Sequence, residues 1–331
     1  MLAAVLKERG ILEIEERPEP PAPPAGYVRV AVRSVGICGS DVHYYQEGAI
    51  GHFVVRAPMV LGHEAAGIVE AVGPGVEGFP RGAVVALEPG IPCGKCGYCR
   101  TGAYNLCPEV RFFATPPIDG AMQEYVLHPV EFTYLAPGLT TDQAALAEPL
   151  SVGVYAVRET RIGVGTQVGI VGAGPVGVLA ALAAESAGGH VVLVDIREDR
   201  VATARQIGLE AYKQAPPALE ACEVVLECSG SAGGLRLAQQ WVKRGGVLAL
   251  IGLGEAAAMV LDGLDLSLRG ITVRGIFRYA NVMPAAIAIL QRNRERLHIF
   301  LGTTIGLRSL PAFLEQKEYL KPLKTIVRVP E

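Results

Sequence analysis

The spacing of hydrophobic and polar positions changes near residue 141. Before that point, short runs of apolar and β-branched residues are separated by Gly and Pro, a pattern typical of β-strands. We expect such strands at 1–6, 27–34, 66–72 and 83–87. The proline-rich segment Pro18–Pro24 predicts a stiff, extended connector. The first part of the chain is therefore predicted to be rich in β-structure.

Beyond residue 141, short β-type runs alternate with longer helical runs. The β-type runs cover 168–171, 191–195, 224–227 and 247–251. The helical runs cover 175–186, 197–207 and 235–242, and a last helix is expected at 282–291. Alternation of this kind predicts βαβ units and a parallel sheet.

Residues 162–184 contain no charged side chain, and a run of this length invites comparison with a membrane span, which needs about 20 apolar residues. The run contains Pro175 and six glycines, three of which gather at Gly172, Gly174 and Gly177. A strand, a tight turn and a buried helix account for this composition better than a membrane span. The start of the chain lacks the pattern of a secretory signal, so we expect a cytoplasmic protein without membrane contact.

Composition and charge limit the possible partners. The 331 residues are 50% hydrophobic and 19% charged, and a chain of this length predicts about two domains. Gly and Pro together make up about a fifth of the chain, below the roughly 25–30% that marks low-complexity sequences. The net charge is −3 and the isoelectric point is about 6.1. These values argue against a nucleic-acid partner, so we expect a small-molecule ligand.

The segment Gly172–Gly177 follows a β-type run and opens a helical run. Its three glycines allow a tight turn, the approach of a pyrophosphate to the backbone, and close packing of helix on strand. Asp195 ends the next strand, where a carboxylate accepts the ribose hydroxyls of NAD and repels the 2′-phosphate of NADP. We therefore expect NAD. Arg197 leaves NADP open as one alternative, and a glycine turn without any nucleotide is the other.

Four of the seven cysteines stand in one Gly-rich segment, at Cys93, Cys96, Cys99 and Cys107. Thiolates at these spacings can converge on one tetrahedral ion, and four protein ligands leave no position for a substrate. We therefore predict a structural zinc ion, with disulfides or free thiols as the alternative. Cys222 and Cys228 fall in the parallel-sheet region and are expected to be buried core residues.

Two other segments are rich in metal ligands, Cys38–His43 and Gly62–Gly67. Cys38 and His63 supply a soft sulfur and an imidazole, and the third ligand is either Glu64 or Glu148. Three protein ligands and one open position are typical of a catalytic zinc site. Taken singly, each of these residues is equally compatible with a packed core.

At these motifs the sequence resembles the zinc-dependent medium-chain dehydrogenase/reductase family. The stretch Gly62–Gly67 is similar to the zinc signature of that family, the four-cysteine segment to its structural zinc lobe, and the glycine loop with Asp195 to its NAD fingerprint. Within the family, the chain looks most like the polyol dehydrogenases, which include sorbitol and xylitol dehydrogenases. The stretches that carry this likeness are 35–44, 58–64, 112–117, 148–153 and 275–279.

This resemblance implies an α/β protein with two domains. A GroES-like, β-rich catalytic domain is expected at 1–150 and 285–331, with the structural zinc lobe at 88–110, and a doubly wound Rossmann domain at 151–284. The implied reaction oxidises a secondary alcohol of a polyol to a ketose, with hydride transfer to NAD. The resemblance also implies two zinc ions per chain and a homotetramer.

The resemblance further assigns roles to single residues. The catalytic zinc is expected on Cys38, His63 and Glu64, with Glu148 as a further ligand or as the acid that holds the metal-bound water. Asp41 is expected to orient His63, and Ser40 and His43 to relay the proton. The substrate positions are Tyr44, Phe112, Arg278 and Tyr279. The cofactor positions are Gly172, Gly174, Pro175, Val176, Gly177, Asp195 and Arg200.

The chain departs from the family pattern in two places. It keeps the four-cysteine lobe, which many animal polyol dehydrogenases lack. The segment 213–221 is shorter than the usual third strand and helix of the nucleotide domain, which changes the adenine side of that domain.

Two alternative functions stay open. L-Threonine 3-dehydrogenases share both zinc sites, but usually have Thr at the position of Ser40 and lack the run Phe277–Tyr279. A non-catalytic protein that binds NAD and zinc would not need to keep together all five of the residues Cys38, His63, Glu64, Ser40 and Glu148.

Overall fold

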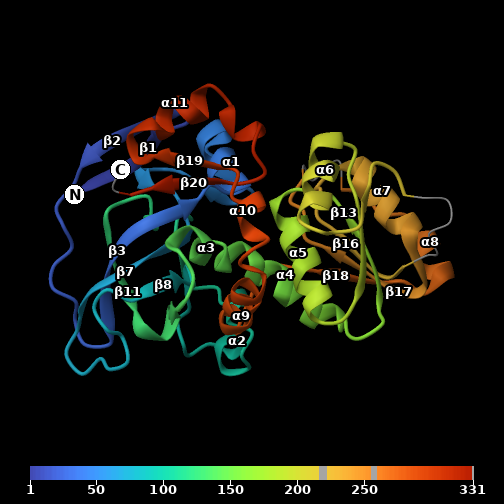
Figure 1. Cartoon of the computed structure of the whole chain (residues 1–331), viewed down its shortest axis with the longest axis horizontal. Helices are drawn as coiled ribbons and strands as arrows, with labels where there is room; N and C mark the ends of the chain where they lie inside the picture. The colour runs from blue at the N-terminus through green and yellow to red at the C-terminus, as the bar shows by residue number, and fades with distance from the viewer. Residues whose placement is uncertain (216–221, 255–258, 330–331) are drawn as a thin grey trace. The chain divides into compact units, whose positions relative to one another are not determined.

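The chain forms two compact units in the computed structural model, which describes residues 1–215, 222–254 and 259–329 (Figure 1). Unit 1 contains Met1–Glu148 and Leu290–Glu331, and unit 2 contains Pro149–Ile289. The chain passes from one unit to the other within the helices α4 (Ala147–Thr160) and α9 (Met283–Asn293). Most of the shortened segment 213–221 lies outside the described residues, so its effect on the nucleotide domain stays a prediction.

Unit 1 is built mainly of β-strands. Its largest sheet has the order β12-β8-β7-β3-β20-β19, with β11 beside β3. These strands are β3 (Tyr27–Gly36), β7 (Glu64–Val72), β8 (Val84–Leu87), β11 (Tyr125–Pro129), β12 (Thr133–Leu135), β19 (Thr303–Gly306) and β20 (Thr325–Arg328). All pairs in this sheet are antiparallel except β19 with β20.

Smaller sheets and short helices complete unit 1. The other strands are β1 (Leu2–Glu8), β2 (Ile11–Glu16), β4 (Ala49–Ile50), β5 (Phe53–Val54), β6 (Met59–Val60), β9 (Gly90–Ile91) and β10 (Arg111–Phe112). The helices are α1 (Gly39–Glu47), α2 (Gly97–Arg100), α3 (Thr141–Ala145), α10 (Leu297–Phe300) and α11 (Leu310–Glu315). The predicted connector Pro18–Pro24 is an irregular segment between β2 and β3.

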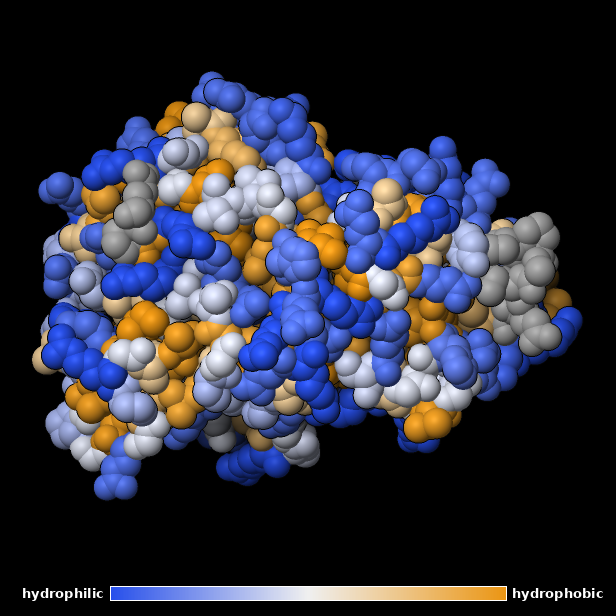
Figure 2. Space-filling model, viewed as in Figure 1, coloured by the Kyte–Doolittle hydropathy of each residue, from blue (hydrophilic) through white to orange (hydrophobic). Residues whose placement is uncertain are grey.

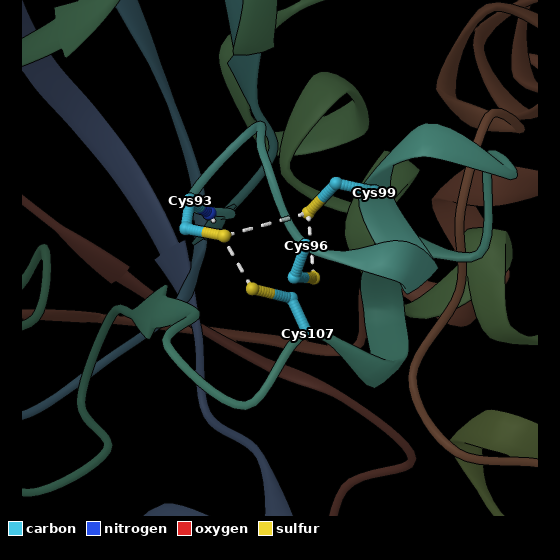
Figure 3. Close-up of side chains that lie close together, drawn as sticks. All are labelled: Cys93, Cys96, Cys99 and Cys107. Carbon is cyan, nitrogen blue, oxygen red and sulfur yellow. Dashed lines mark hydrogen bonds between the residues drawn. The ribbon is translucent and has the colours of Figure 1, made fainter.

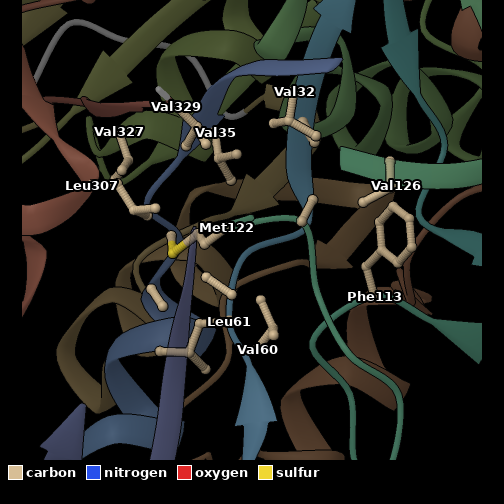
Figure 4. Packing of buried hydrophobic residues seen from close by; sticks show 14 of the residues in the cluster. Val32, Val35, Val60, Leu61, Phe113, Met122, Val126, Leu307, Val327 and Val329 are labelled. Atoms are coloured by element: carbon tan, nitrogen blue, oxygen red, sulfur yellow. The ribbon is translucent and has the colours of Figure 1, made fainter. Parts of the chain in front are cut away.

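The core of unit 1 joins segments that lie far apart in the sequence. Val35 and Met122 are almost completely buried and belong to the same hydrophobic cluster as Leu307, Val327 and Val329 (Figure 4). Removing this apolar surface from water is the main contribution to the stability of such a core. The C-terminal segment is therefore part of unit 1.

Unit 2 has the parallel sheet that the alternating pattern predicts. Its strand order is β15-β14-β13-β16-β17-β18, and each described pair is parallel. The strands are β13 (Gln167–Val171), β14 (His190–Val194), β15 (Ala211–Tyr212), β16 (Cys222–Glu227), β17 (Val242–Leu250) and β18 (Thr272–Gly275). The helices between them are α5 (Pro175–Ser186), α6 (Glu198–Gln206), α7 (Ala232–Trp241) and α8 (Gly263–Arg269).

The uncharged run of residues 162–184 forms β13, a turn and α5, as predicted. Eight consecutive residues of α5, from Gly177 to Ala184, are buried, because a helix that is apolar all round has no face for water. Gly153 of α4 lets the two helices approach closely, since a Cβ there would lie 2.7 Å from Cα of Ala180. Among the described residues, no helix is long and apolar enough to cross a membrane. Hydrophilic side chains cover much of the face shown in Figure 2.

A buried carboxyl group lies inside unit 1, directly after β8. Glu88 is 2% exposed, and its carboxylate accepts hydrogen bonds from the hydroxyls of Tyr104 (2.7 Å) and Tyr134 (2.9 Å). Burial raises the pKa of Glu88 from 4.5 to about 7, because the two tyrosines compensate only part of the lost hydration. The folded protein therefore binds a proton at Glu88 that the unfolded chain releases between these two pH values.

The substitution Glu88→Gln should make the protein more stable at high pH. A raised carboxyl pKa lowers the free energy of unfolding as the pH rises from about 5 to about 7, by at most about 3 kcal/mol. The amide keeps the size of the side chain and cannot ionise. Thermal unfolding from pH 5 to pH 8 should show a gain for Glu88→Gln that grows with pH. The exposed Glu131→Gln serves as the control, and equal pH profiles for both variants would contradict the prediction.

Candidate functional site: two metal centres and a nucleotide loop

The four predicted zinc cysteines lie together in one loop of unit 1. The thiols of Cys96 and Cys99 are 3.4 Å apart, and those of Cys93 and Cys99 are 3.9 Å apart. Figure 3 shows all four sulfur atoms turned toward one another, and they lie within 4.8 Å of one another. Tetrahedral zinc with Zn–S bonds near 2.3 Å places its sulfur ligands about 3.8 Å apart. The geometry thus fits a zinc ion and is too wide for disulfide bonds, and all seven cysteines are free.

Backbone N–H groups favour the thiolate form of one of these four cysteines, Cys93. The amides of Lys95 and Cys96 point at the sulfur of Cys93 and lower the pKa of that thiol to about 7. Only a deprotonated cysteine binds zinc, so a lowered pKa favours the metal-bound form at neutral pH.

A second group of metal ligands lies at the end of β3 and the start of β7. Cys38 caps the N-terminus of α1, and Glu64 is the first residue of β7. One sulfur, one imidazole nitrogen and one carboxylate oxygen, from Cys38, His63 and Glu64, lie within 4.8 Å of one another. His63 is 7% and Glu64 1% exposed. A sulfur, an imidazole and a carboxylate are a donor set that suits zinc and leaves a fourth position open.

Asp41 holds the two ligand segments together through their backbones. Its buried carboxylate accepts hydrogen bonds from the N–H of Cys38 (2.9 Å) and the N–H of Gly62 (3.0 Å). The distance from the carboxylate to Nδ1 of His63 is 3.8 Å, too long for a hydrogen bond. Asp41 therefore acts on His63 by charge and by fixing the neighbouring backbone.

Negative groups surround the imidazole of His63. Burial alone would lower the pKa of His63, but Cys38, Asp41 and Glu148 outweigh it and raise this pKa well above its usual value. Glu148 is buried in the first turn of α4 and lies outside the close group of three ligand residues. A site with this charge favours a cation, either a proton or a metal ion.

Besides Asp41, helix α1 carries three more of the predicted site residues. Ser40 is half-buried in the first turn, two residues after Cys38. His43 is half-exposed, and its Nδ1 lies 3.5 Å from a carboxylate oxygen of Glu47. Tyr44 is only 4% exposed and belongs to the hydrophobic core cluster of unit 1.

The other predicted substrate residues belong to different units. The ring of Phe112 in β10 lies 5.8 Å from the ring of His63. Arg278 and Tyr279 follow β18 in unit 2, and the guanidinium of Arg278 lies over the ring of Phe277. Their role toward a substrate stays a prediction.

The predicted glycine loop in unit 2 joins β13 to α5. Gly172 has a φ of 104°, which favours glycine, and a Cβ at Gly177 would lie 1.8 Å from the carbonyl oxygen of Gly172. Gly174 caps the N-terminus of α5, Pro175 is its first residue, and Val176 follows. The loop thus has the tight turn and close helix packing on which phosphate binding at a helix N-terminus depends.

Asp195 is fixed beside this loop. Its carboxylate accepts hydrogen bonds from the N–H of Ala173 (2.7 Å) and the N–H of Arg197 (2.8 Å). The guanidinium of Arg197 is paired with Asp199. Arg200 is partly buried, and its Nη1 has no hydrogen-bond partner among the described residues. A carboxylate and a guanidinium are therefore both available near the glycine loop.

The two remaining cysteines differ in exposure. Cys222 is buried in the core of unit 2, as predicted. Cys228 is half-buried directly after β16, next to the glycine loop.

Known families and relatives match both units. Residues 24–138 match the alcohol dehydrogenase GroES-like domain, and residues 175–292 match the zinc-binding dehydrogenase domain. The sorbitol dehydrogenase of Bacillus subtilis is 40% identical over 305 residues, which cover 88% of this chain and 86% of that protein. The chain belongs to the zinc-dependent medium-chain dehydrogenase family. It is an oxidoreductase of that family, so the resemblance and the predicted fold class are confirmed.

Solved structures agree with this dehydrogenase along its whole length. L-Idonate 5-dehydrogenase from Escherichia coli is 26% identical with a TM-score of 0.90, over 99% of this chain and 97% of that one. A zinc-binding dehydrogenase from Sinorhizobium meliloti bound to NADP is 27% identical with a TM-score of 0.89, over 99% and 98%. Zinc and a nicotinamide nucleotide are thus the cofactors of the group to which this dehydrogenase belongs.

One residue close to the metal ligands was not predicted from the sequence. Lys324 is buried and forms an ion pair with Glu64. It stands some 260 residues after that glutamate, and no motif marks it. Only the pairing of β3 with β20 brings it near, and sequence reasoning did not predict this pairing.

The substitution Asp41→Asn should weaken metal binding at the Cys38 cluster and leave the four-cysteine site unchanged. The N–H groups of Cys38 and Gly62 bind different oxygens of the Asp41 carboxylate, and asparagine has only one side-chain oxygen. The variant therefore loses one of the two hydrogen bonds that hold the ligand segments together. Loss of such a supporting contact typically costs about 10–100-fold in metal affinity. Competition with a zinc chelator should release one of two zinc ions earlier than in the parent protein.

Asp119→Asn is the matched control, because Asp119 also accepts a backbone hydrogen bond, from Val60, but its other carboxylate oxygen pairs with Arg17 and not with the backbone of Cys38 or Gly62. Identical zinc release from both variants would show that Asp41 has no part in metal binding.

Proposed function

We propose that this dehydrogenase oxidises a secondary alcohol of a sorbitol- or xylitol-like polyol to a ketose, with NAD as the hydride acceptor. The proposal is carried by one observation: the cluster Cys38, His63 and Glu64 occurs in a chain that is 40% identical to a sorbitol dehydrogenase. The alcohol loses a hydride to NAD and a proton to the protein, so the products are the ketose, NADH and a proton.

The residues of α1 are suited to remove the proton. Zinc bound by Cys38, His63 and Glu64 would act as a Lewis acid that makes the alcohol easier to deprotonate. Ser40 and His43 stand three positions apart on one side of α1, so a proton can pass from the alcohol to the Ser40 hydroxyl and on to the His43 ring. His43 is half-exposed and can release the proton to water.

The choice of NAD over NADP rests on Asp195. Its carboxylate stands beside the glycine loop and would accept the ribose hydroxyls but repel a 2′-phosphate. Arg197, the residue that favours NADP, is already paired with Asp199. Arg200 has an Nη1 without a hydrogen-bond partner among the described residues, and this atom would be available to the cofactor.

The four-cysteine loop is proposed to hold a second zinc ion with a structural role, since four sulfur ligands leave no position for a substrate. Assembly as a homotetramer stays a prediction from the resemblance, and residence in the cytoplasm stays an expectation.

The reaction is tested by following NADH absorbance with sorbitol, xylitol and L-threonine, each with and without a zinc chelator. We expect chelator-sensitive turnover of a polyol and none of threonine. Cys38→Ser should abolish turnover and lower the zinc content by about one ion per chain, whereas Cys222→Ala, in the core of unit 2, should leave the zinc content unchanged. Turnover of threonine, or full activity of Cys38→Ser, would refute the assignment.

The substitution Asp195→Ala should raise the KM for NAD by roughly 10–100-fold, because it removes a charged acceptor for the ribose hydroxyls. It should also narrow the preference for NAD over NADP, because the repulsion of the 2′-phosphate is lost. Glu198→Ala, which removes a neighbouring exposed carboxylate and leaves the pair of Arg197 with Asp199 intact, is the control. An unchanged KM for NAD in Asp195→Ala would remove Asp195 from the cofactor site.

A further inference from the structure

Lys324 is a buried cation next to the proposed catalytic zinc ligands. It is 3% exposed, forms an ion pair with Glu64, and donates a hydrogen bond of 2.8 Å to the carbonyl of Ile37. Lysine is almost never fully buried without a partner, because a charge loses its hydration there. The lysine thus contacts one ligand residue directly and the backbone just before another, Cys38.

The sheet explains how Lys324 reaches Glu64. Strand β3 lies between β7 and β20, and at its last residue Gly36 is paired with Glu64 on one side and Ile326 on the other. A Cβ at Gly36 would lie 2.1 Å from Oε2 of Glu64 and 2.9 Å from Cε of Lys324. The ion pair between Lys324 and Glu64 therefore passes over β3 at Gly36, because glycine has no Cβ and leaves room for both side chains.

The charges around Lys324 give it a role beyond packing. The ammonium group is held between the Glu64 carboxylate and the carbonyl of Ile37, so it lies against one proposed metal ligand and against the backbone just before another, Cys38. A metal ion bound there would be repelled by the ammonium and would compete with it for the Glu64 carboxylate.

We infer that Lys324 is a positioning residue that holds the Glu64 carboxylate and shares its charge with the catalytic metal. The inference rests on the proposed function only in that Cys38, His63 and Glu64 bind zinc. Without metal, Lys324 neutralises Glu64; with metal, it limits how much negative charge Glu64 gives to the ion. The lysine thereby sets the affinity of this site for zinc and keeps the carboxylate in place when the metal leaves.

The substitution Lys324→Met should make the site bind zinc about tenfold more tightly or more, because one repelling charge is lost and the carboxylate has only the metal as its partner. The zinc-loaded full-length protein is titrated with a chelator of known zinc affinity, and the retained zinc is measured. Lys324→Arg keeps the charge and should behave like the parent protein. Lys321→Met removes an exposed lysine paired with Glu318 and should have no effect.

Exchange of zinc for cobalt gives a readout that a purely structural lysine would not change. The visible absorption bands of Co²⁺ at the Cys38 cluster should shift in Lys324→Met, because Glu64 donates more charge, and should return in Lys324→Arg. The thermal stability of the metal-free protein should fall in Lys324→Met, and zinc should restore more of it than in the parent protein. Unchanged zinc affinity together with unchanged cobalt bands would overturn the inference.

A double variant keeps the test valid if Lys324→Met folds poorly. Lys324→Met with Glu64→Gln removes both members of the ion pair, and its gain in zinc affinity over Glu64→Gln alone should be clearly smaller than the gain of Lys324→Met over the parent protein, because only the direct repulsion is removed. Equal gains in the two backgrounds would show that Lys324 does not act through Glu64, and would refute the inference. No substrate or NAD is used, so an absence of polyol turnover leaves these results untouched. A parent protein that binds zinc only at the four cysteines would instead refute the proposed catalytic site itself.

Discussion

The proposed metal-ligand cluster of Cys38, His63 and Glu64 depends on the hydrogen-bonded register of β3. Through Ser34–Gly36 this strand is paired with β7 on one side and with β20 on the other. The pairing sets Glu64 and Lys324 on either side of Gly36, two residues before Cys38. A slip of one residue would turn every side chain of a strand to the opposite face, so the ligands could not meet in another register. The buried apolar side chains of β3 hold this register in place.

The local parts of the molecule could be predicted from local patterns. The four cysteines span 15 residues, and the glycine loop with its acid spans 24, so spacing alone was enough to place them. The contacts that join distant segments could not be predicted in this way. Asp41 was expected at the ring of His63, whereas its carboxylate accepts the N–H groups of Cys38 and Gly62. The sequence pattern does not predict which backbone N–H groups a buried carboxylate will bind.

The two proposed metal sites differ in exposure, in the number of chain segments that supply their ligands, and in the charged groups around them. The four-cysteine loop is partly exposed, and its ligands come from one short segment supported by local N–H groups. The Cys38 cluster is largely buried, is assembled from separate segments, and is surrounded by Asp41, Glu148 and Lys324. Buried charges interact strongly because little water screens them, so each neighbour changes the chemistry of the ion. The four-cysteine loop offers four sulfur ligands and no open position, in keeping with the structural role proposed for its ion.

Unit 1 is formed by two separate stretches of the chain, and this affects the order in which the two units can fold during synthesis on the ribosome. Unit 2 is one continuous stretch of chain, from Pro149 to Ile289, and can complete its sheet as soon as that stretch has emerged. Unit 1 must wait, because Leu307, Val327 and Val329 fill its core and β20 closes one side of β3. During translation, β3 and the Glu64 carboxylate therefore exist for a time without their last partners. The nascent protein has a finished nucleotide domain while its catalytic domain still lacks the final strands, and chaperones that bind unpaired strand edges would find their target in that interval.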